Sequence, residues 1–169
     1  MSAIRDLPHD RLRVLAETFA KNWLAHDGLW FQAVERAYGL DKAIALDAEA
    51  WRLFSPLEAK RIKDFLGLPE NGGLEALREA LEYRLYAVLN RQTAELTADG
   101  KLRFYMNDCR VQSARKKKGL PDFPCRSVGI VEYSTFAKEI DPRIETRCLA
   151  CPPEEHPDTF FCGWEFSID

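Results

Sequence analysis

The sequence predicts an α+β fold, in which an N-terminal helical layer packs on a small antiparallel sheet with a four-cysteine metal site. Three observations support this prediction. Apolar residues in the first hundred positions recur at three- and four-residue steps, as in amphipathic helices. After position 100 the apolar residues alternate with polar ones, as in half-buried strands. Four of the five cysteines fall within the last 45 residues, at Cys125, Cys148, Cys151 and Cys162.

Length and composition favour a single domain over residues 1–169, with a mainly helical half (1–98) and a strand-rich, metal-binding half (99–169). Hydrophobic residues make up 46% of the chain, so a core can form without a metal, which would pin only a local region. The net charge of −3 argues against general nucleic-acid binding. The chain lacks an apolar leader and a stretch of membrane-spanning length, so we expect a cytoplasmic protein with no membrane association.

Two helices are expected at the start of the chain. The first covers about 12–34, because apolar residues there follow helical spacing. Gly28 lies within this pattern and is expected to bend or break it, and Gly39 ends the element. The second helix covers about 41–53.

Two more helices are expected before residue 98. The tetrad 55–58, Ser-Pro-Leu-Glu, resembles a capping box with proline in the first turn, which predicts a new, short helix ending at Leu66. The Asn-Gly-Gly sequence at 71–73 predicts a loop. Leucines at steps of three and four then predict one long helix over 74–96.

The second half is expected to contain three strands and one helix. Alternating apolar residues predict strands at about 102–107, 143–149 and 160–168. A helix is expected over about 125–140. The basic run before Pro121 and the proline-rich segment 151–158 are expected to be loops, because proline interrupts regular structure.

The cysteine spacing predicts a metal site. The C-x-x-C pair Cys148 and Cys151 presents two thiols from one turn, and Cys125 and Cys162 complete a tetrahedral set. Zinc suits four sulfur ligands, and an iron–sulfur cluster is the alternative. His156 could replace one ligand, and four ordinary buried cysteines would also explain the pattern. Since four protein sulfurs leave no position for water, we expect a structural metal.

A candidate ligand pocket lies on the first helix. Trp23 and Trp30 are three and four residues from His26, so the three side chains lie on the same face. An aromatic-walled pocket with a histidine suits a small ligand, for which Arg110 and Gln112 are further candidates. A core histidine with a hydrogen-bond partner explains the same pattern.

A catalytic alternative involves Cys109. Its neighbour Arg110 would favour the thiolate, so Cys109 is a candidate nucleophile with His26 as its base. Asp108 or Asp27 would orient that base. A half-buried strand cysteine beside a surface arginine is the plainer explanation of the same residues.

The segment from about residue 100 to 169 resembles the 4-vinyl-reductase-type domain, a small-molecule-binding module. In that family a cysteine at the head of a helix, a Glu-x-x-Cys pair and a last cysteine bind zinc, and the matching positions are Cys125, Cys151 and Cys162. Cys148 occupies the place of the family's glutamate, and Glu145 competes with it in a shifted register. The resemblance implies a zinc-containing, small-molecule-binding protein and a homodimer formed through helices.

Over its full length the chain resembles an uncharacterised cytosolic prokaryotic family described as L-2-amino-thiazoline-4-carboxylic acid hydrolase-like. The segments that carry this likeness are NWLAHDGLWF, MNDCRVQSARKKKGLPDFPC, SVGIVEY and IDPRI. The likeness implies the alternative function, a hydrolase of a small cyclic amide-like or thiazoline substrate. An iron–sulfur redox protein is the second alternative to the small-molecule-binding protein.

Overall fold

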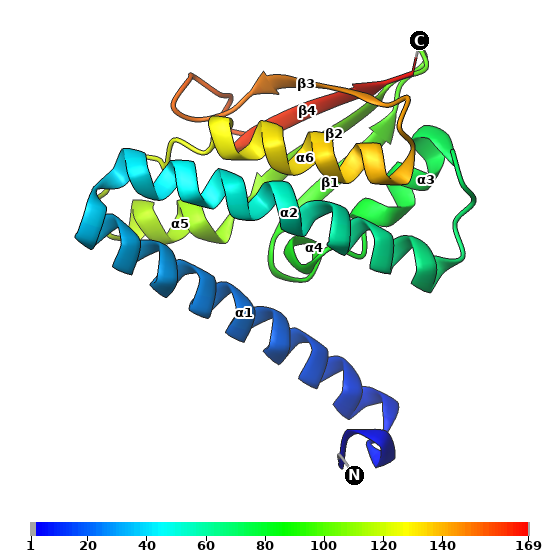
Figure 1. Ribbon diagram of the computed structural model, residues 1–169, viewed down its shortest axis with the longest axis horizontal. Coiled ribbons are helices and arrows are strands. Elements are labelled where there is room, and N and C mark those ends of the chain that lie inside the picture. The colour runs from blue at the N-terminus through cyan, green and yellow to red at the C-terminus, as the bar shows by residue number, and fades with distance from the viewer. Residues whose placement is uncertain (1–2, 169) are drawn as a thin grey trace.

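The computed structural model describes residues 3–168 and has a helical first half and a strand-rich second half (Figure 1). After a short 3-10 turn, Ala3–Asp6, the helices are α1 (His9–Tyr38), α2 (Leu40–Leu66), α3 (Gly73–Leu81), α4 (Leu85–Leu89), α5 (Arg110–Lys117) and α6 (Arg126–Ile140). The strands are β1 (Arg91–Leu96), β2 (Leu102–Asp108), β3 (Glu145–Ala150) and β4 (Cys162–Ser167). This confirms the predicted α+β class. Within the described residues no helix is both long and apolar enough to cross a membrane.

The elements form successive layers. Helix α6 packs on β3 and on α2, so it lies between the sheet and the rest of the helical layer. Helix α1 crosses α2 and α4, and its N-terminal half projects away from the other elements (Figure 1). Of its described side chains, only that of Ala20 is fully buried. The interior therefore depends mainly on α2, α3, α6 and the sheet.

The sheet is antiparallel, with the strand order β1-β2-β4-β3. In the middle of the sheet Phe104 of β2 pairs with Trp164 of β4, and Trp164 pairs with Cys148 of β3. The buried face of the sheet meets α6 through Tyr133, whose ring is 5.4 Å from that of Phe104 and 4.9 Å from that of Trp164. A β-bulge follows Cys148.

Gly129 allows α6 to approach β4 closely. A Cβ atom at this position would lie 2.7 Å from Cζ2 of Trp164, closer than carbon atoms can pack. Since glycine has no side chain, the indole of Trp164 fills the space over the helix. The helix predicted over 125–140 and the strands predicted around 102–107, 143–149 and 160–168 are confirmed.

Two predicted interruptions of the first helices are wrong. Helix α1 runs through Gly28, and α2 is one helix from Leu40 to Leu66 that contains Pro56. Proline in a helix removes one hydrogen bond, but Ser55 and Ala59 on either side are fully buried, and their packing outweighs that loss. The capping box is therefore not formed.

The long helix predicted over 74–96 is also wrong beyond Leu81. The chain turns at Glu82–Arg84, because the extended backbone of Arg84 places its side chain in the interior. The short helix α4 follows, and residues 91–96 form β1, an edge strand paired with β2. The sheet consequently has four strands and not three.

The polar run after β2 is a helix. Residues 110–117 form α5, with Cys109 at its N-cap position, whereas the sequence predicted a strand end followed by a loop. The run is too polar for its hydrophobic pattern to indicate a helix. Its one fully buried residue, Gln112, is anchored by hydrogen bonds to the chain at Phe123.

Candidate functional site

Four aromatic side chains meet where α1 crosses α2 and α4. The Trp51 ring stacks on Tyr86 at 5.7 Å and meets Trp23 and Phe54 edge to face at 6.0 and 5.5 Å. Trp23 is also stacked near Phe54, with ring centroids 6.0 Å apart. Edge-to-face and stacked contacts of this kind hold aromatic rings in fixed orientations. This aromatic cluster therefore forms a defined wall between α1 and α2.

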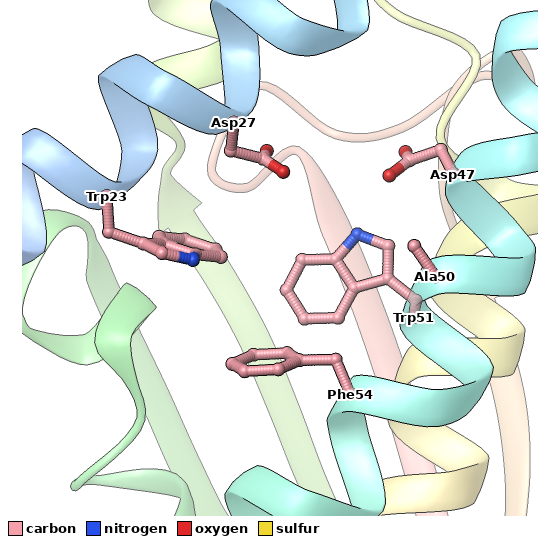
Figure 2. Close-up of a pocket in the computed structure, with 6 residues that line it drawn as sticks. All are labelled: Trp23, Asp27, Asp47, Ala50, Trp51 and Phe54. Carbon is pink, nitrogen blue, oxygen red and sulfur yellow. The ribbon is translucent and has the colours of Figure 1, made fainter.

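Two hollows lie beside the aromatic cluster. The inner hollow has a volume of about 120 Å³, and its lining residues are Trp23, Asp27, Asp47, Ala50, Trp51 and Phe54 (Figure 2). The outer hollow, of about 430 Å³, is lined by Trp23, His26, Asp27 and Trp30. Because both are lined by Trp23 and Asp27, we treat them as one site with a smaller inner part and a larger outer part. Apolar walls with a few polar groups are typical of small-molecule sites.

Two carboxyl groups face each other across the inner hollow. Asp27 comes from α1 and Asp47 from α2, and Figure 2 shows the two carboxylates pointing toward one another above the aromatic rings. Burial, then the charges of Asp27 and Glu132, raise the pKa of Asp47 to about 7, despite a hydrogen bond with Trp51 that lowers it. Burial also raises the pKa of Asp27, and the neighbouring His26 partly offsets this. Two carboxylates in such proximity resist ionising together.

A buried arginine lies behind the aromatic cluster. Nε of Arg84 donates to Oε2 of Glu58 at 2.9 Å, and Nη2 forms an ion pair with Oε1 of Glu132 at 2.7 Å. Glu58 also accepts a hydrogen bond from the backbone N–H of Leu85 at 3.1 Å. Burial alone would lower the pKa of Arg84. The charges of Glu58 and Glu132 raise this pKa by more than burial lowers it, so the guanidinium remains charged.

The guanidinium of Arg84 is enclosed by rings as well as by carboxylates. It lies 4.8 Å from the ring centroid of Phe136, 5.3 Å from that of Tyr133, and 5.9 Å from those of Trp51 and Tyr86. These are cation–π distances. Arg84 thus connects the sheet side of α6 with the aromatic cluster at the hollow.

The predicted ligand residues separate into two groups. Trp23, His26 and Trp30 line the outer hollow, as their shared helix face implied. Gln112 instead donates to the carbonyl of Phe123 at 2.9 Å and accepts from its N–H at 2.8 Å. Arg110 begins α5, where its backbone N–H donates to Asn90.

The catalytic candidates lie on three elements: His26 on α1, Asp108 at the end of β2 and Cys109 at the N-cap of α5. Burial raises the pKa of Cys109 to about 12, so this thiol would need a base to act as a nucleophile at neutral pH. Asp108 accepts a hydrogen bond from the hydroxyl of Ser113 at 2.8 Å. His26 faces the outer hollow beside Asp27.

The four remaining cysteines come together at one end of the sheet. Cys125 precedes α6, Cys148 lies on β3, Cys151 follows it and Cys162 begins β4. The Sγ atoms of Cys125 and Cys151 are 3.6 Å apart. Hydrogen bonding with Cys125 and Cys162 raises the pKa of Cys151, and Cys148 also hydrogen-bonds with Cys151. In the described part of the chain, however, no three His, Cys, Asp or Glu side chains are arranged so that they could hold a metal ion.

Both proposed substitutes for a cysteine ligand have partners elsewhere. Glu145 pairs with Lys138 at 2.8 Å, and His156 contacts Asp122 at 3.2 Å. Gln112 of α5 approaches Sγ of Cys125 at 3.4 Å, so this helix braces the cluster.

Sequence reasoning missed the acidic and inner parts of the site. Asp47, Phe54 and Arg84 were absent from the predicted set, because each reaches the site only through the packing of α1, α2 and α4. One feature could have indicated Asp47. It is a polar residue four positions before the core tryptophan Trp51, on the same helical face.

Comparison with known proteins identifies the family. A family model, described as "Family of unknown function (DUF6125)", matches residues 5–168. The chain belongs to the DUF6125 family. No curated protein matches this DUF6125 chain. The comparisons give no support to the two family names expected from the sequence.

One solved structure resembles this DUF6125 protein. It is described as the crystal structure of the phenol-responsive sensory domain of the transcription activator PoxR with phenol. The match has a TM-score of 0.55 and 17% sequence identity, and it covers 85% of this chain and 73% of the other. At this identity the likeness demonstrates the fold alone.

Proposed function

We propose that this protein binds a small organic molecule in the hollow between α1 and α2. The observation that carries the proposal is the inner hollow, where rigid aromatic walls and two carboxyl groups converge (Figure 2). Such a combination provides burial for a ligand's apolar body and polar groups that orient it.

The fold likeness supports the proposal. The PoxR domain is a phenol-responsive sensory domain, so an α+β arrangement of this kind is compatible with small-molecule binding. In this respect the proposal keeps the expectation of a small-molecule-binding protein, although the hollow lies between α1 and α2 and not between the helices and the sheet. Hydrolysis, with Cys109 as nucleophile and His26 as base, is the alternative; it depends on that base, because burial raises the pKa of the Cys109 thiol.

The second part of the proposal is a structural zinc ion held by Cys125, Cys148, Cys151 and Cys162. A tetrahedron of sulfurs about 2.3 Å from zinc has edges of about 3.8 Å, close to the 3.6 Å between two of these sulfurs. A zinc ion at this place would tie α6 to β3 and β4. An iron–sulfur cluster remains the alternative occupant. Free thiols of this kind suit the reducing cytoplasm, which is the location we propose.

We also propose a homodimer. Helix α1 has exposed apolar side chains, among them Phe19, Leu29 and Trp30, which are 52%, 66% and 67% exposed. Surfaces of this kind favour association. Light scattering after size-exclusion chromatography would test this part separately, and a mass of one chain at micromolar concentration would contradict it.

The binding proposal is tested by filling the inner hollow. Ala50 lines it, and Ala50→Phe would place a ring there without deleting a contact. Ala45→Phe, at an exposed position of the same helix, is the matched control. A panel of small aromatic compounds is screened by thermal shift and calorimetry. We expect compounds that bind the natural protein and the control but not Ala50→Phe. Absence of any binder, or equal binding to both variants, would refute the proposal.

A further inference from the structure

The inner hollow has an excess of negative charge. Asp27 and Asp47 line it, and Glu132, from α6, lies close enough to raise the pKa of Asp47. Glu132 forms an ion pair with Arg84, which also pairs with Glu58. Among these described groups, one guanidinium is surrounded by four carboxylates, those of Asp27, Asp47, Glu58 and Glu132. When all of them are ionised, negative charges exceed positive charges by three.

We propose that the ligand of this site is a small organic cation, whose charged nitrogen lies between Asp27 and Asp47. This inference rests on the proposed function and adds the chemical class of the ligand. The site would take a protonated amine attached to a flat, apolar body. The nitrogen would meet both carboxylates, and the body would lie against the aromatic cluster.

The geometry suits such a ligand. In Figure 2 the carboxylates of Asp27 and Asp47 approach from opposite helices, and the rings of the aromatic cluster lie below the space between them. The indole N–H of Trp51 points toward that space and hydrogen-bonds with Asp47. A cation there would be stabilised by the charges of the two carboxylates, and its apolar body would pack against the rings.

The other titratable groups near the hollow do not neutralise the carboxylates of Asp27 and Asp47. His26, beside Asp27 on α1, lines the outer hollow. Arg84 lies on the far side of Trp51 and Tyr86, where Glu58 and Glu132 already neutralise it. Burial raises the pKa of Tyr86, so this phenol stays neutral. Without a cation, the carboxyl pair avoids repulsion by holding a proton.

Other ligand classes fit less well. An anionic ligand would meet the two carboxylates that line the inner hollow and would be repelled. A neutral ligand could bind only beside a carboxyl pair that keeps its proton, so it would gain no charge interaction. A cation replaces that proton, and its binding should release the proton to solvent.

The experiment uses three probes with the same ring and different charge: benzylammonium, benzyl alcohol and benzoate. Calorimetry at pH 7 in buffers of different ionisation enthalpy measures affinity and proton release together. We expect benzylammonium to bind about tenfold or more tightly than benzyl alcohol, with release of a proton, and benzoate not to bind.

Single substitutions test whether the preference for benzylammonium over benzyl alcohol depends on the carboxyl groups of Asp27 and Asp47. Asp27→Asn and Asp47→Asn should each bring benzylammonium down to the affinity of benzyl alcohol. Asp64→Asn, at an exposed position of α2, should leave the preference unchanged. Benzyl alcohol binding as tightly as benzylammonium would overturn the cation inference and leave the proposed function standing. Failure of all three probes, together with failure of the thermal-shift panel, would overturn both.

Discussion

The Sγ atoms of Cys125 and Cys151 lie 3.6 Å apart, although the two residues are 26 positions apart in the chain. This distance corresponds to van der Waals contact between two sulfur atoms, and it is also close to the edge of a zinc–thiolate tetrahedron. Cys125 precedes α6 and Cys151 follows β3, so a metal there would join the start of the helix to the end of the strand.

The first prediction concerns this metal. Cys151→Ser should remove the bound metal and lower the melting temperature by at least about 5 °C, because metal binding contributes to folding free energy. Cys109→Ser is the control and should keep the metal. Elemental analysis of the purified proteins measures the content, with about one zinc per chain expected. Brown, iron-containing protein would instead indicate the cluster, and natural protein without any metal would contradict the proposal.

The second prediction concerns the buried ion pairs. Arg84→Ala leaves Glu58 and Glu132 without their shared cation, and should lower the free energy of unfolding by about 3–5 kcal/mol. Urea denaturation measures this change. The matched control is Arg78→Ala, which removes a surface pair with Glu75 and should change stability by less than about 0.5 kcal/mol. Similar losses of stability in the two variants would show that the buried ion pairs contribute no more to stability than the surface pair.

The third prediction compares one substitution at two glycines. Gly129→Ala would force a methyl group against Trp164 and should destabilise the protein by about 1–3 kcal/mol. Gly28→Ala, in the middle of α1, meets no atom within 4 Å and should stabilise it by about 0.5–1 kcal/mol. Thermal and urea unfolding should give these opposite signs. Stabilisation by both changes would mean that α6 is not closely packed on β4.

The fourth prediction concerns the pH dependence of stability. In the folded protein Asp47 keeps its proton up to about pH 7, whereas its ordinary pKa is 3.8. The folded state therefore binds more protons than the unfolded state within this range, and the contribution of Asp47 to stability falls as the pH rises from about 4 to about 7.

Asp47→Asn should remove this dependence and stabilise the protein by about 1–2 kcal/mol at pH 8, with little effect at pH 4. Asp64→Asn is the control on the same helix. Urea denaturation at the two pH values measures the difference. An Asn variant that is less stable than the natural protein at pH 8 would show that Asp47 is not under electrostatic strain.

Patterns that depend on near neighbours were predictable from the sequence. The helix over 125–140 and the strands 102–107 and 160–168 were predictable from the local sequence. Strand β2 alternates buried and half-buried residues as expected, whereas β4 is buried on both faces. The face formed by Trp23, His26 and Trp30 was likewise local, since three- and four-residue spacing defines it.

Features that depend on distant partners were not predictable. Residues 84–96 continue a leucine spacing that favours helix, yet Arg84 turns inward to reach carboxylates 26 residues earlier and 48 residues later. Asp47 was missed for the same reason, because its pKa is raised first by burial in the folded chain and then by the charge of Asp27 on another helix. Pro56 led to the opposite error. It predicted a boundary between two helices, but burial of its neighbours keeps α2 as one continuous helix.

The position of β4 has a consequence for how the molecule assembles. This strand is the last of the four along the chain, yet it lies between β2 and β3. During synthesis β3 has no partner until β4 leaves the ribosome, and α6 has no Trp164 to cover. In that interval β3 is unpaired and an apolar face of α6 is uncovered, and chaperones bind exposed surfaces of this kind.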